Sequence, residues 1–578
     1  MKKAKGITRR SFLGATACGA IVAGGSMLTA CAPSSSASSA ADNAEPSTTG
    51  TWRDMPEPIA DDAIAETHEA DIVILGAGQA GSCAARAASE AGARVIVVEM
   101  QPEDFYMVNG SEVGSINSSL SISRGAPRYE PSELVRECLL RSINRADARL
   151  VKTYAENCGP HVDWFLEPLG EEWLEHIHSY MTPAPKHYKE GCNGLKNFIG
   201  TNSFFGGEGY SLTDAMIVQH TLAKEAGAQF FFGTTAEQPV MQEGACVGLI
   251  GKTEDGSYIK FMAKKGVLLC GGGFSANEEM VRDLLKEYSE FKGDEPIMGN
   301  GRDGSGIRIG VWAGGHVEED PRAGTYSNQS GMAGSFAATA FLRLDANGNR
   351  YSNEGMYGAW GQGAASLRQS SPFVCCVFDS NWREELEYQP PDHFCVDVSD
   401  EKLMESLTAA MEKIQVGPEG GDSAVSATPL PFDVAYHYWA ADTIEDLARY
   451  MGFEDEAAEQ FVASVARYNE LCDKGVDEDF GKDASLMHPI KKPPFYGYKE
   501  DKNVGNLVVT LSGLRIDHNQ QVVDAAYQPI PGLFASGNNS GGRFAVQYMT
   551  PMGGLSVGMA QTLGHVLGEY VAGLKDTY

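Results

Sequence analysis

The sequence is poor in basic residues and lacks the cysteine spacings that hold metals. Its 46 lysines and arginines stand against 77 aspartates and glutamates, which gives a formal net charge of −31. An acidic surface of this strength disfavours nucleic acid and anionic lipid as partners. The 12 cysteines include no C-x-x-C and no C-x-x-C-H, so no iron–sulfur cluster, structural zinc or c-type haem is expected. No metal site is predicted.

The chain also lacks an apolar run long enough to span a membrane comfortably. The best candidate, residues 15–28, is glycine-rich and shorter than the about 20 residues that a span needs. It follows TRRSFL at residues 8–13, a twin-arginine pattern. It leads into LTAC at residues 28–31, which is similar to a bacterial lipobox. Residues 1–31 are therefore predicted to direct export, with a lipid anchor at Cys31 at the periplasmic or extracytoplasmic membrane surface; the alternative is a soluble exported protein cleaved nearby.

A tether is expected next, at residues 32–65, because its first part consists largely of Ser, Ala, Pro and Thr. The globular body is predicted to begin near Glu66. Some 500 residues remain, enough for two or three domains with cores of their own.

Residues 70–100 read as strand, glycine turn, helix, strand and acid, the order of a dinucleotide-binding unit. An apolar strand at residues 72–75 precedes the turn, and another at residues 95–98 ends at Glu99. In such a unit the glycines permit the turn, the approach of a pyrophosphate and close helix packing, and the acid accepts ribose hydroxyls. The predicted contacts are Gly76, Gly78, Gly81 and Glu99, and the acid disfavours NADP.

Several later loops carry small polar residues that could wrap the same cofactor. They are a loop after the first unit, two glycine-rich turns in the middle of the chain, and a strand–turn–helix unit near its end. A helix N-terminus there could polarise a ring carbonyl or an oxyanion. The predicted contacts are Ser115, Asn117, Gly272, Asn277, Gly304, Gly537, Asn538, Gly554, Leu555 and Ser556.

Three stretches together resemble the flavoprotein family of fumarate reductase, urocanate reductase and 3-ketosteroid Δ1-dehydrogenase. They are ILGAGQAGSCAARAASEAGARVIVVEM, KKGVLLCGGGFSANEEMV and GLFASGNNSGGRF with GGLSVGMAQTLG. The resemblance implies FAD, bound covalently or not, and an α/β fold in which a Rossmann-like FAD-binding domain carries an inserted α+β capping domain. By position the FAD-binding domain spans 66–325 and 509–578, and the cap spans 326–508, with the active site between them.

The family's catalytic residues are only partly present. Its fumarate reductases have an R-F-x-N-E element and a proton-donating arginine after it, whereas this chain reads RYSNE at residues 350–354, then Gly358 with Tyr357 beside it. The place of a C-terminal arginine that grips a substrate carboxylate falls at about Tyr548. The dicarboxylate clamp is therefore missing, so fumarate and succinate are not expected and urocanate is disfavoured. Arg350 and Glu354 are predicted to form a structural ion pair.

Tyrosines stand near these two places in the family's ketosteroid dehydrogenases. Tyr357 is the first candidate for the proton donor and Tyr548 the second, with Arg543 holding a carboxylate, a phenol or the flavin. The alternative for each tyrosine is an aromatic wall over the flavin. In the implied chemistry, hydride passes from flavin N5 to the β-carbon of an activated alkene and an acid protonates the α-carbon.

The sequence therefore predicts an exported FAD-dependent reductase of an activated C=C bond of enone or acrylate type. It would be a terminal reductase of anaerobic respiration, with a small unsaturated substrate and a membrane-side electron donor such as a quinol-linked cytochrome c or an FMN protein. Two alternatives stay open, a 3-ketosteroid-type ring dehydrogenase and a non-catalytic surface flavin electron-relay protein. The substrate, the physiological direction and the oligomeric state are not specified by these motifs.

Overall fold

A computed structural model describes residues 51–207, 209–286, 302–326, 336, 338–356, 365–366, 368–392, 395–425, 435–501, 507–548 and 550–574. The predicted export signal with Cys31, most of the predicted tether, and Tyr357 lie outside the described residues. The chain divides into two compact units, residues 1–54 and 55–578, and the fold below is that of the second.

The largest sheet contains the predicted dinucleotide unit. Its strand order is β17-β18-β9-β1-β2-β6, and the neighbours from β18 to β6 run parallel. Two further strands, β7 and β8, continue antiparallel from β9. The bounds are β1 Ile64–Leu75, β2 Val95–Val98, β6 Gln229–Phe231, β7 Thr234–Gln242, β8 Ala245–Thr253, β9 Tyr258–Leu269, β17 Gln521–Val523 and β18 Pro529–Ala535. The parallel sheet with its crossover helices confirms the predicted α/β class.

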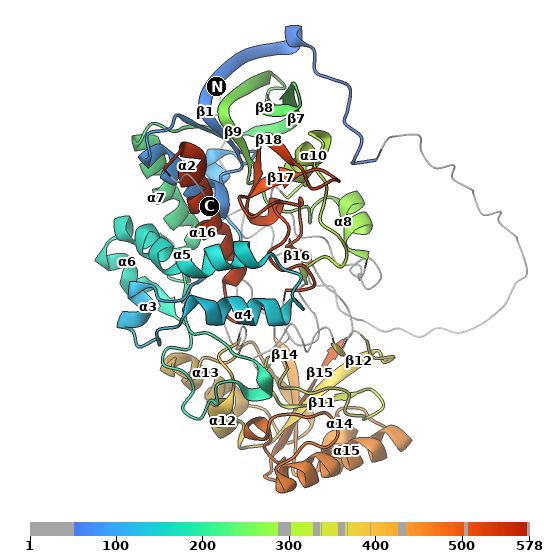
Figure 1. The fold of residues 1–578 in the computed structure, drawn as a ribbon. Helices are drawn as coiled ribbons and strands as arrows, with labels where there is room; N and C mark the ends of the chain where they lie inside the picture. Colours follow the sequence, from blue (N-terminus) through green and yellow to red (C-terminus); the bar gives the residue numbers. More distant parts are fainter. Residues whose placement is uncertain are drawn as a thin grey trace, which may run out of the picture. The chain divides into compact units, whose positions relative to one another are not determined.

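Helices from both ends of the chain pack together on this sheet (Figure 1). Helix α2, Gln79–Glu90, follows the first glycine turn, and helix α16, Leu555–Ala572, crosses it. The crossing is close because a Cβ at Gly564 would lie 2.3 Å from the Ala80 carbonyl oxygen. Further helices of this part are α4 Pro131–Arg141, α5 Ala148–Leu166, α7 Leu212–Glu225, α8 Glu278–Leu284 and α10 Ser305–Trp312.

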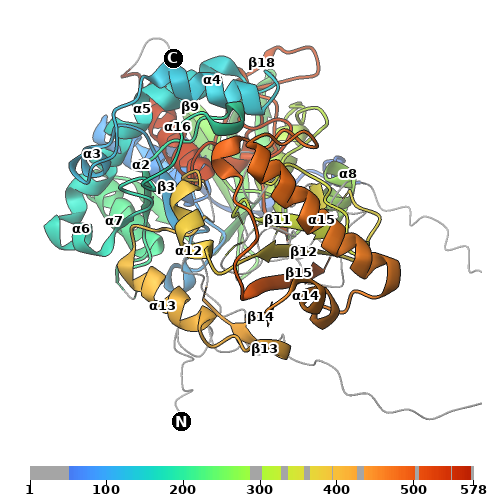
Figure 2. The same ribbon diagram turned by 90° about the horizontal axis from the view of Figure 1, so that it is seen from below.

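A second, antiparallel sheet lies within the predicted cap. Its order is β11-β12-β15-β14-β13, and strand β12 shows how it is buried on both faces. Cys375 and Val377 pack with α14 and α15, whereas Cys376 and Phe378 pack with α12 and α13; Figure 2 shows α15 beside β11 and β12. The bounds are β11 Leu342–Asp345, β12 Phe373–Phe378, β13 Gly417–Ser423, β14 Tyr436–Ala441, β15 Phe495–Asp501, α12 Trp382–Glu385, α13 Glu401–Met411, α14 Ile444–Tyr450 and α15 Asp455–Lys474.

Two small sheets complete the framework around the site. One joins β3 Glu112–Gly114, β5 Thr201–Ser203 and β4 His178–Ser179, and the other joins β10 Gly324–Tyr326 to β16 Leu507–Thr510. The short helix α3 spans Ser119–Ser123 and α6 spans Glu171–His176. In the described part of the chain, no helix combines the length and the apolar character needed to cross a bilayer.

Ordered structure begins earlier than the predicted boundary at Glu66. The side chain of Gln238 on β7 accepts from Ile59 N–H at 3.0 Å and donates to the Glu57 carbonyl at 2.8 Å. Residues 57–59 are thus attached to the sheet and are not part of a free tether. The tether was predicted from the composition of its first part, and no local signal in residues 57–59 indicates the distant partner Gln238.

Candidate active site

The three glycines of the first turn meet different surroundings. Gly76 has φ +93°, and a Cβ there would lie 2.6 Å from the Cys270 carbonyl oxygen. A Cβ at Gly81 would lie 1.9 Å from the Gly76 carbonyl oxygen, so the helix packs directly on the turn. At Gly78, the N-cap of α2, no atom lies within 4 Å of that position. Two glycines are therefore required by protein packing, whereas the third leaves open space beside a helix N-terminus.

Glu99 closes this turn from the end of β2. The side chain is 5% exposed, and its two carboxylate oxygens accept from Ala77 N–H at 2.7 Å and Gln101 N–H at 2.8 Å. Burial raises the pKa of Glu99 above its usual value, although these N–H groups oppose the shift. The predicted acid is thus held at the edge of the turn, where a ribose would approach.

The first of the two middle turns is held by a residue that sequence analysis did not select. Asn539 Oδ1 accepts from Gly271 N–H, and Asn539 Nδ2 donates to the Gly272 carbonyl, both at 2.6 Å. Gly272 itself has φ +84° and no atom within 4 Å of a Cβ position. Gly304 has φ +76° and its N–H donates to the Gly273 carbonyl. The paired asparagines at 538–539 after a strand were the available signal, and the prediction selected only Asn538.

Two predicted asparagines use their side chains inside the protein. Asn117 donates to the Tyr129 carbonyl at 2.8 Å and accepts from Tyr129 N–H at 2.9 Å. Asn277 caps helix α8 by accepting from Met280 N–H, and its Nδ2 donates to the Asp303 carbonyl. Their contact with a cofactor stays a prediction.

The last predicted loop leads into the N-terminus of α16. Gly537 has φ +61° and approaches Ala80 of α2, with 3.1 Å between the two Cβ positions. Gly554 is the N-cap of α16 with φ +68°, and its carbonyl accepts from Gly114 N–H at 2.9 Å. Leu555 is buried, whereas Ser556 is half-buried. The beginning of α16 is thereby fastened to β3, so loops from both ends of the chain share one site.

Buried hydroxyl groups around these loops lack partners among the described residues. They belong to Ser115 after β3, Ser512 after β16 and Ser536 at the end of β18. A buried hydroxyl without a hydrogen bond costs free energy, so such groups are normally satisfied by a ligand or water. Together with the open space at Gly78 and Gly272, they fit a large polar ligand such as a flavin dinucleotide.

Arg543 is a buried cation with unused hydrogen-bonding capacity. Its side chain is almost fully buried, and Nη2 donates to Asn538 Oδ1 at 2.7 Å. Nε and Nη1 have no partner among the described residues. Burial lowers the pKa of Arg543 to about 10, and the nearby carboxylate of Glu318 opposes the shift. The guanidinium stays charged at neutral pH and can donate to an electron-rich group.

Tyr548 lies five residues further along the same loop. It is buried against Phe544, with 5.2 Å between ring centroids, and Ser556 N–H donates to its hydroxyl at 3.4 Å. Burial raises the pKa of Tyr548 to about 12, and the contact with Ser556 opposes the shift. The phenol therefore keeps its proton through the physiological range.

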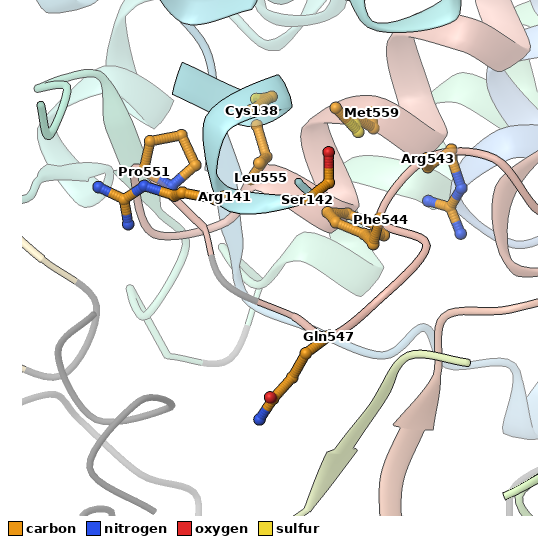
Figure 3. A pocket seen from close by; sticks show the side chains of 9 residues that line it. All are labelled: Cys138, Arg141, Ser142, Arg543, Phe544, Gln547, Pro551, Leu555 and Met559. Atoms are coloured by element: carbon orange, nitrogen blue, oxygen red, sulfur yellow. The ribbon is translucent and has the colours of Figure 1, made fainter. Parts of the chain in front are cut away.

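A small cavity lies between this loop and helix α4 (Figure 3). Figure 3 shows Arg141 and Arg543 on opposite sides of it. Arg141 donates to the Thr550 carbonyl at 2.8 Å and to Asn197 Oδ1 at 2.5 Å, so it holds the loop in place. The cavity volume is about 10 Å³, room for one water molecule and not for an organic substrate. Arg141 therefore has a structural role, whereas Arg543 keeps unused donors on Nε and Nη1.

Glu318 was missed by sequence analysis and connects three parts of the site. Its carboxylate accepts from Gly542 N–H at 2.8 Å and from Gly513 N–H at 3.2 Å. These partners lie 224 and 195 residues away in the sequence. Because these partners are distant in the sequence, no local motif predicts the role of Glu318.

The predicted ion pair of Arg350 and Glu354 is present in the cap. Arg350 Nε donates to Glu354 at 2.8 Å and its Nη2 to Asp477 at 2.8 Å. Lys482 adds a second buried cation 3.3 Å from Glu354. The structure thus confirms the predicted structural ion pair and extends it to four groups.

Comparison with known proteins agrees with this geometry. The profile of the FAD-binding domain family matches residues 71–557. Vinyl phenol reductase of Lactiplantibacillus plantarum is 26% identical over 526 residues, 88% of this chain and 97% of that protein. Digoxin reductase of Eggerthella lenta is 25% identical over 601 residues, 99% of this chain and 98% of that protein. A solved 3-ketosteroid-Δ4-(5α)-dehydrogenase from Rhodococcus jostii superposes with a TM-score of 0.64 at 21% identity, over 89% of this chain and 99% of its own. These matches confirm the predicted fold class and FAD as the cofactor.

Proposed function

The chain belongs to the FAD-binding family of flavoproteins, and on this premise we propose that it reduces an activated C=C bond in a small molecule. The substrate class would be an enone or an acrylate and not a simple dicarboxylate. Support comes from full-length relatives named vinyl phenol reductase and digoxin reductase. The enzyme is accordingly an FAD-dependent oxidoreductase, and the bond that it reduces is the proposal.

The observation that carries the proposal is the buried guanidinium of Arg543 with two unused nitrogens, Nε and Nη1. A single guanidinium can polarise one carbonyl, or bind one phenol or one carboxylate group. A dicarboxylate carries two anionic groups, whereas Arg543 offers one cation with unused donors and Arg141 donates to the protein instead. An alkene activated by one carbonyl or one carboxylate group matches this supply of donors.

Bound FAD, once reduced, supplies hydride chemistry to this site. The chain itself would hold the activating oxygen at Arg543 and exclude water around it, since the loop is buried. Tyr548 would hold a proton at its phenolic oxygen, ready for the α-carbon of the substrate. Overall, an alkene would take up two electrons and two protons and become the saturated product.

The test is anaerobic reoxidation of the reduced protein by a panel of alkenes. The panel holds fumarate, urocanate, substituted cinnamates, a vinyl phenol and steroid enones. Return of the flavin absorbance with a cinnamate, vinyl phenol or enone, and not with fumarate, is expected. Rapid return with fumarate would contradict the proposed substrate class, and no return with any alkene would favour the dehydrogenase or electron-relay alternatives.

Substitution of Tyr548 by Phe tests its proton. Tyr548→Phe removes the hydroxyl and keeps the ring that packs on Phe544. Loss of a positioned acid typically costs about 10²–10⁴-fold in rate, so turnover should fall in that range while the FAD content stays unchanged. The control is Tyr527→Phe, which removes the hydroxyl of an exposed tyrosine on a different surface. A full rate in Tyr548→Phe would remove Tyr548 from the mechanism and leave Tyr357 as the candidate donor.

Export through the twin-arginine pathway and a lipid anchor at Cys31 complete the proposal, with electrons supplied from a membrane-side donor. The supporting residues are TRRSFL and LTAC in the leader. Cys31→Ser should move the protein from the membrane fraction to the soluble exported fraction with its flavin retained. Recovery of the variant in the membrane fraction would contradict the anchor.

A further inference from the structure

We propose that Glu318 is a positioning residue for Arg543, because its carboxylate joins the turn at Gly513 to the turn at Gly541–Gly542 from which Arg543 projects. The inference rests on the proposed role of Arg543 at the substrate. It adds a residue that touches neither the substrate nor the flavin and acts through the backbone that carries the guanidinium.

Three segments meet at the Glu318 carboxylate. The first is its own, which follows helix α10. The second is the turn after β16, where Gly513 N–H donates to Glu318 Oε1 at 3.2 Å, while Glu318 N–H donates back to the Gly513 carbonyl at 2.9 Å. The third is the loop after β18, where Gly542 N–H donates to Oε2 at 2.8 Å. Arg543 is the residue that follows this last donor.

The fit around the carboxylate is tight. A Cβ at Gly541 would lie 2.7 Å from both Cδ and Oε2 of Glu318. Gly542 has φ +77°, a conformation that side chains rarely adopt. Glycine at these two positions therefore lets the loop pass directly against the Glu318 carboxylate.

An ionised carboxylate is the group that serves both donors at once. It offers two acceptor oxygens, whereas a glutamine offers one acceptor and one NH2 group that cannot accept. It also gives the buried guanidinium of Arg543 a counter-charge without a direct hydrogen bond, which leaves Nε and Nη1 free for a ligand. A residue that paired directly with Arg543 would use up those donors.

The charge of Glu318 changes near neutral pH. Burial raises its pKa to about 7, and the N–H groups of Gly542 and Gly513 with the guanidinium groups of Arg543 and Arg322 oppose the shift. Arg322 also donates to the Glu318 carbonyl oxygen at 2.9 Å and pairs with Asp320. The carboxylate should hold both turns above about pH 7, and protonation should loosen them below it.

The experiment compares Glu318→Gln with Glu319→Gln in the holoprotein. Glu319 is the exposed neighbour, paired with Arg515 and Tyr527 outside the site, so its variant removes the same charge one residue away. Reoxidation of the reduced protein by the best alkene is measured from pH 5.5 to 8.5. A second readout is the affinity of the oxidised flavin for sulfite at pH 8, followed by bleaching of the flavin band. FAD content and melting temperature are measured for every variant.

In the wild type and in Glu319→Gln, kcat/KM should rise with pH through about 7. In Glu318→Gln the rise should be absent, with kcat/KM at pH 8 about 10–100-fold lower, since displacement of a positioning group by about 1 Å can cost that much. Sulfite affinity should fall about tenfold with FAD content unchanged, because the guanidinium that favours an anion over the flavin is displaced. An unchanged pH rise and unchanged sulfite affinity in Glu318→Gln would overturn the inference.

Gly541→Ala keeps the inference testable if Glu318→Gln does not fold. The added Cβ would lie 2.7–2.9 Å from three atoms of Glu318, so it should displace the carboxylate without altering any charge. It should reproduce the loss of kcat/KM, and wild-type behaviour in this variant would count against the inference.

The variant Arg543→Ala distinguishes the two proposals. Full activity of Arg543→Ala would contradict the proposed roles of both Arg543 and Glu318. Loss of activity in Arg543→Ala together with wild-type behaviour of Glu318→Gln would contradict the role of Glu318 alone. If no alkene reoxidises the flavin, the proposed function fails and the sulfite affinities still decide the inference.

Discussion

Gly78 and Gly81 stand three residues apart in the first turn and differ in what surrounds them. Gly81 is packed on the Gly76 carbonyl, whereas the space at Gly78 is open in the protein alone. The open space is where a bound pyrophosphate would approach the backbone. The two positions therefore separate a folding requirement from a binding requirement.

A matched pair of alanine variants tests this separation. Gly81→Ala should lower the melting temperature by several degrees and reduce FAD binding, because strand and helix must move apart. Gly78→Ala should keep the melting temperature of the apoprotein and weaken FAD binding at least about tenfold, a loss of about 1.4 kcal/mol. Apoprotein melting and fluorescence titration with FAD give the two readouts. Unchanged FAD affinity in Gly78→Ala would contradict the assignment of this space to the cofactor.

Local pattern predicted residues whose partners are near in the sequence. Gly76, Gly81 and Glu99 lie within one strand–helix–strand unit, so their spacing was informative. The prediction selected Asn538 and not its neighbour Asn539, because a pair of identical residues in a turn does not show which of the two faces the neighbouring turn. Glu318 could not be predicted, because its donors come from turns about 200 residues away.

Among the elements, the loop after helix α15 brings two buried charged residues into a cluster in the cap. Asp477 and Lys482 follow α15 and meet Arg350 and Glu354, which follow β11. Burial alone would raise the pKa of Glu354, but Lys482 and Arg350 lower it below the usual value. Burial likewise opposes ionisation of Asp477, and hydrogen bonds from Arg350 and neighbouring N–H groups lower its pKa to about 2.

Glu354→Gln should destabilise the protein strongly. It leaves Arg350 and Lys482 with one carboxylate between them, and breaking a buried ion pair costs about 3–5 kcal/mol. Both acids have lowered pKa values, so their contribution to stability is present above about pH 4 and is lost as the pH falls toward about 2. Urea unfolding at pH 6 and pH 3 measures both effects, with Glu459→Gln on the exposed face of α15 as the control. An unfolding free energy equal to the wild type would show that the network contributes nothing.

At the scale of the molecule, the segment of residues 178–197 joins the FAD-binding part to the cap. It leaves the small sheet at β4 and makes repeated hydrogen bonds to cap residues. Tyr180 donates to the Asp392 carbonyl at 3.1 Å, and Asn193 donates to the Gly355 carbonyl at 2.8 Å. The predicted boundary at residue 326 places this segment in the FAD-binding domain, although its hydrogen bonds go to the cap. Sequence patterns assign a segment by its position in the chain and do not reveal such long-range contacts.

The ion pair of His178 and Asp397 makes this junction sensitive to pH. The hydrogen bond to Asp397, with Nε2 and Oδ2 2.8 Å apart, raises the pKa of His178 above 6.5, with Asp400 adding to the shift and burial and Arg124 opposing it. The contribution of His178 is therefore full below pH 6.5 and is lost as the pH rises through its raised value. The protection factors against hydrogen exchange at residues 178–181, which correct for the faster intrinsic exchange at high pH, should be lower at pH 8.5 than at pH 6. His178→Gln, which keeps a donor without titrating, should remove the difference, and an equal difference in this variant would contradict the assignment.

The junction also determines how this architecture can be recombined. Consider a chimera that exchanges only residues 326–508 between two relatives. Its segment of residues 178–197, here called the strap, would face a foreign cap, so His178, Tyr180 and Asn193 would lose their matched partners. Transplanting the strap at residues 178–197 together with the cap would keep these partners matched. Transfer of substrate preference should therefore require two segments together, residues 178–197 and 326–508, which are separate in the gene although they are adjacent in space.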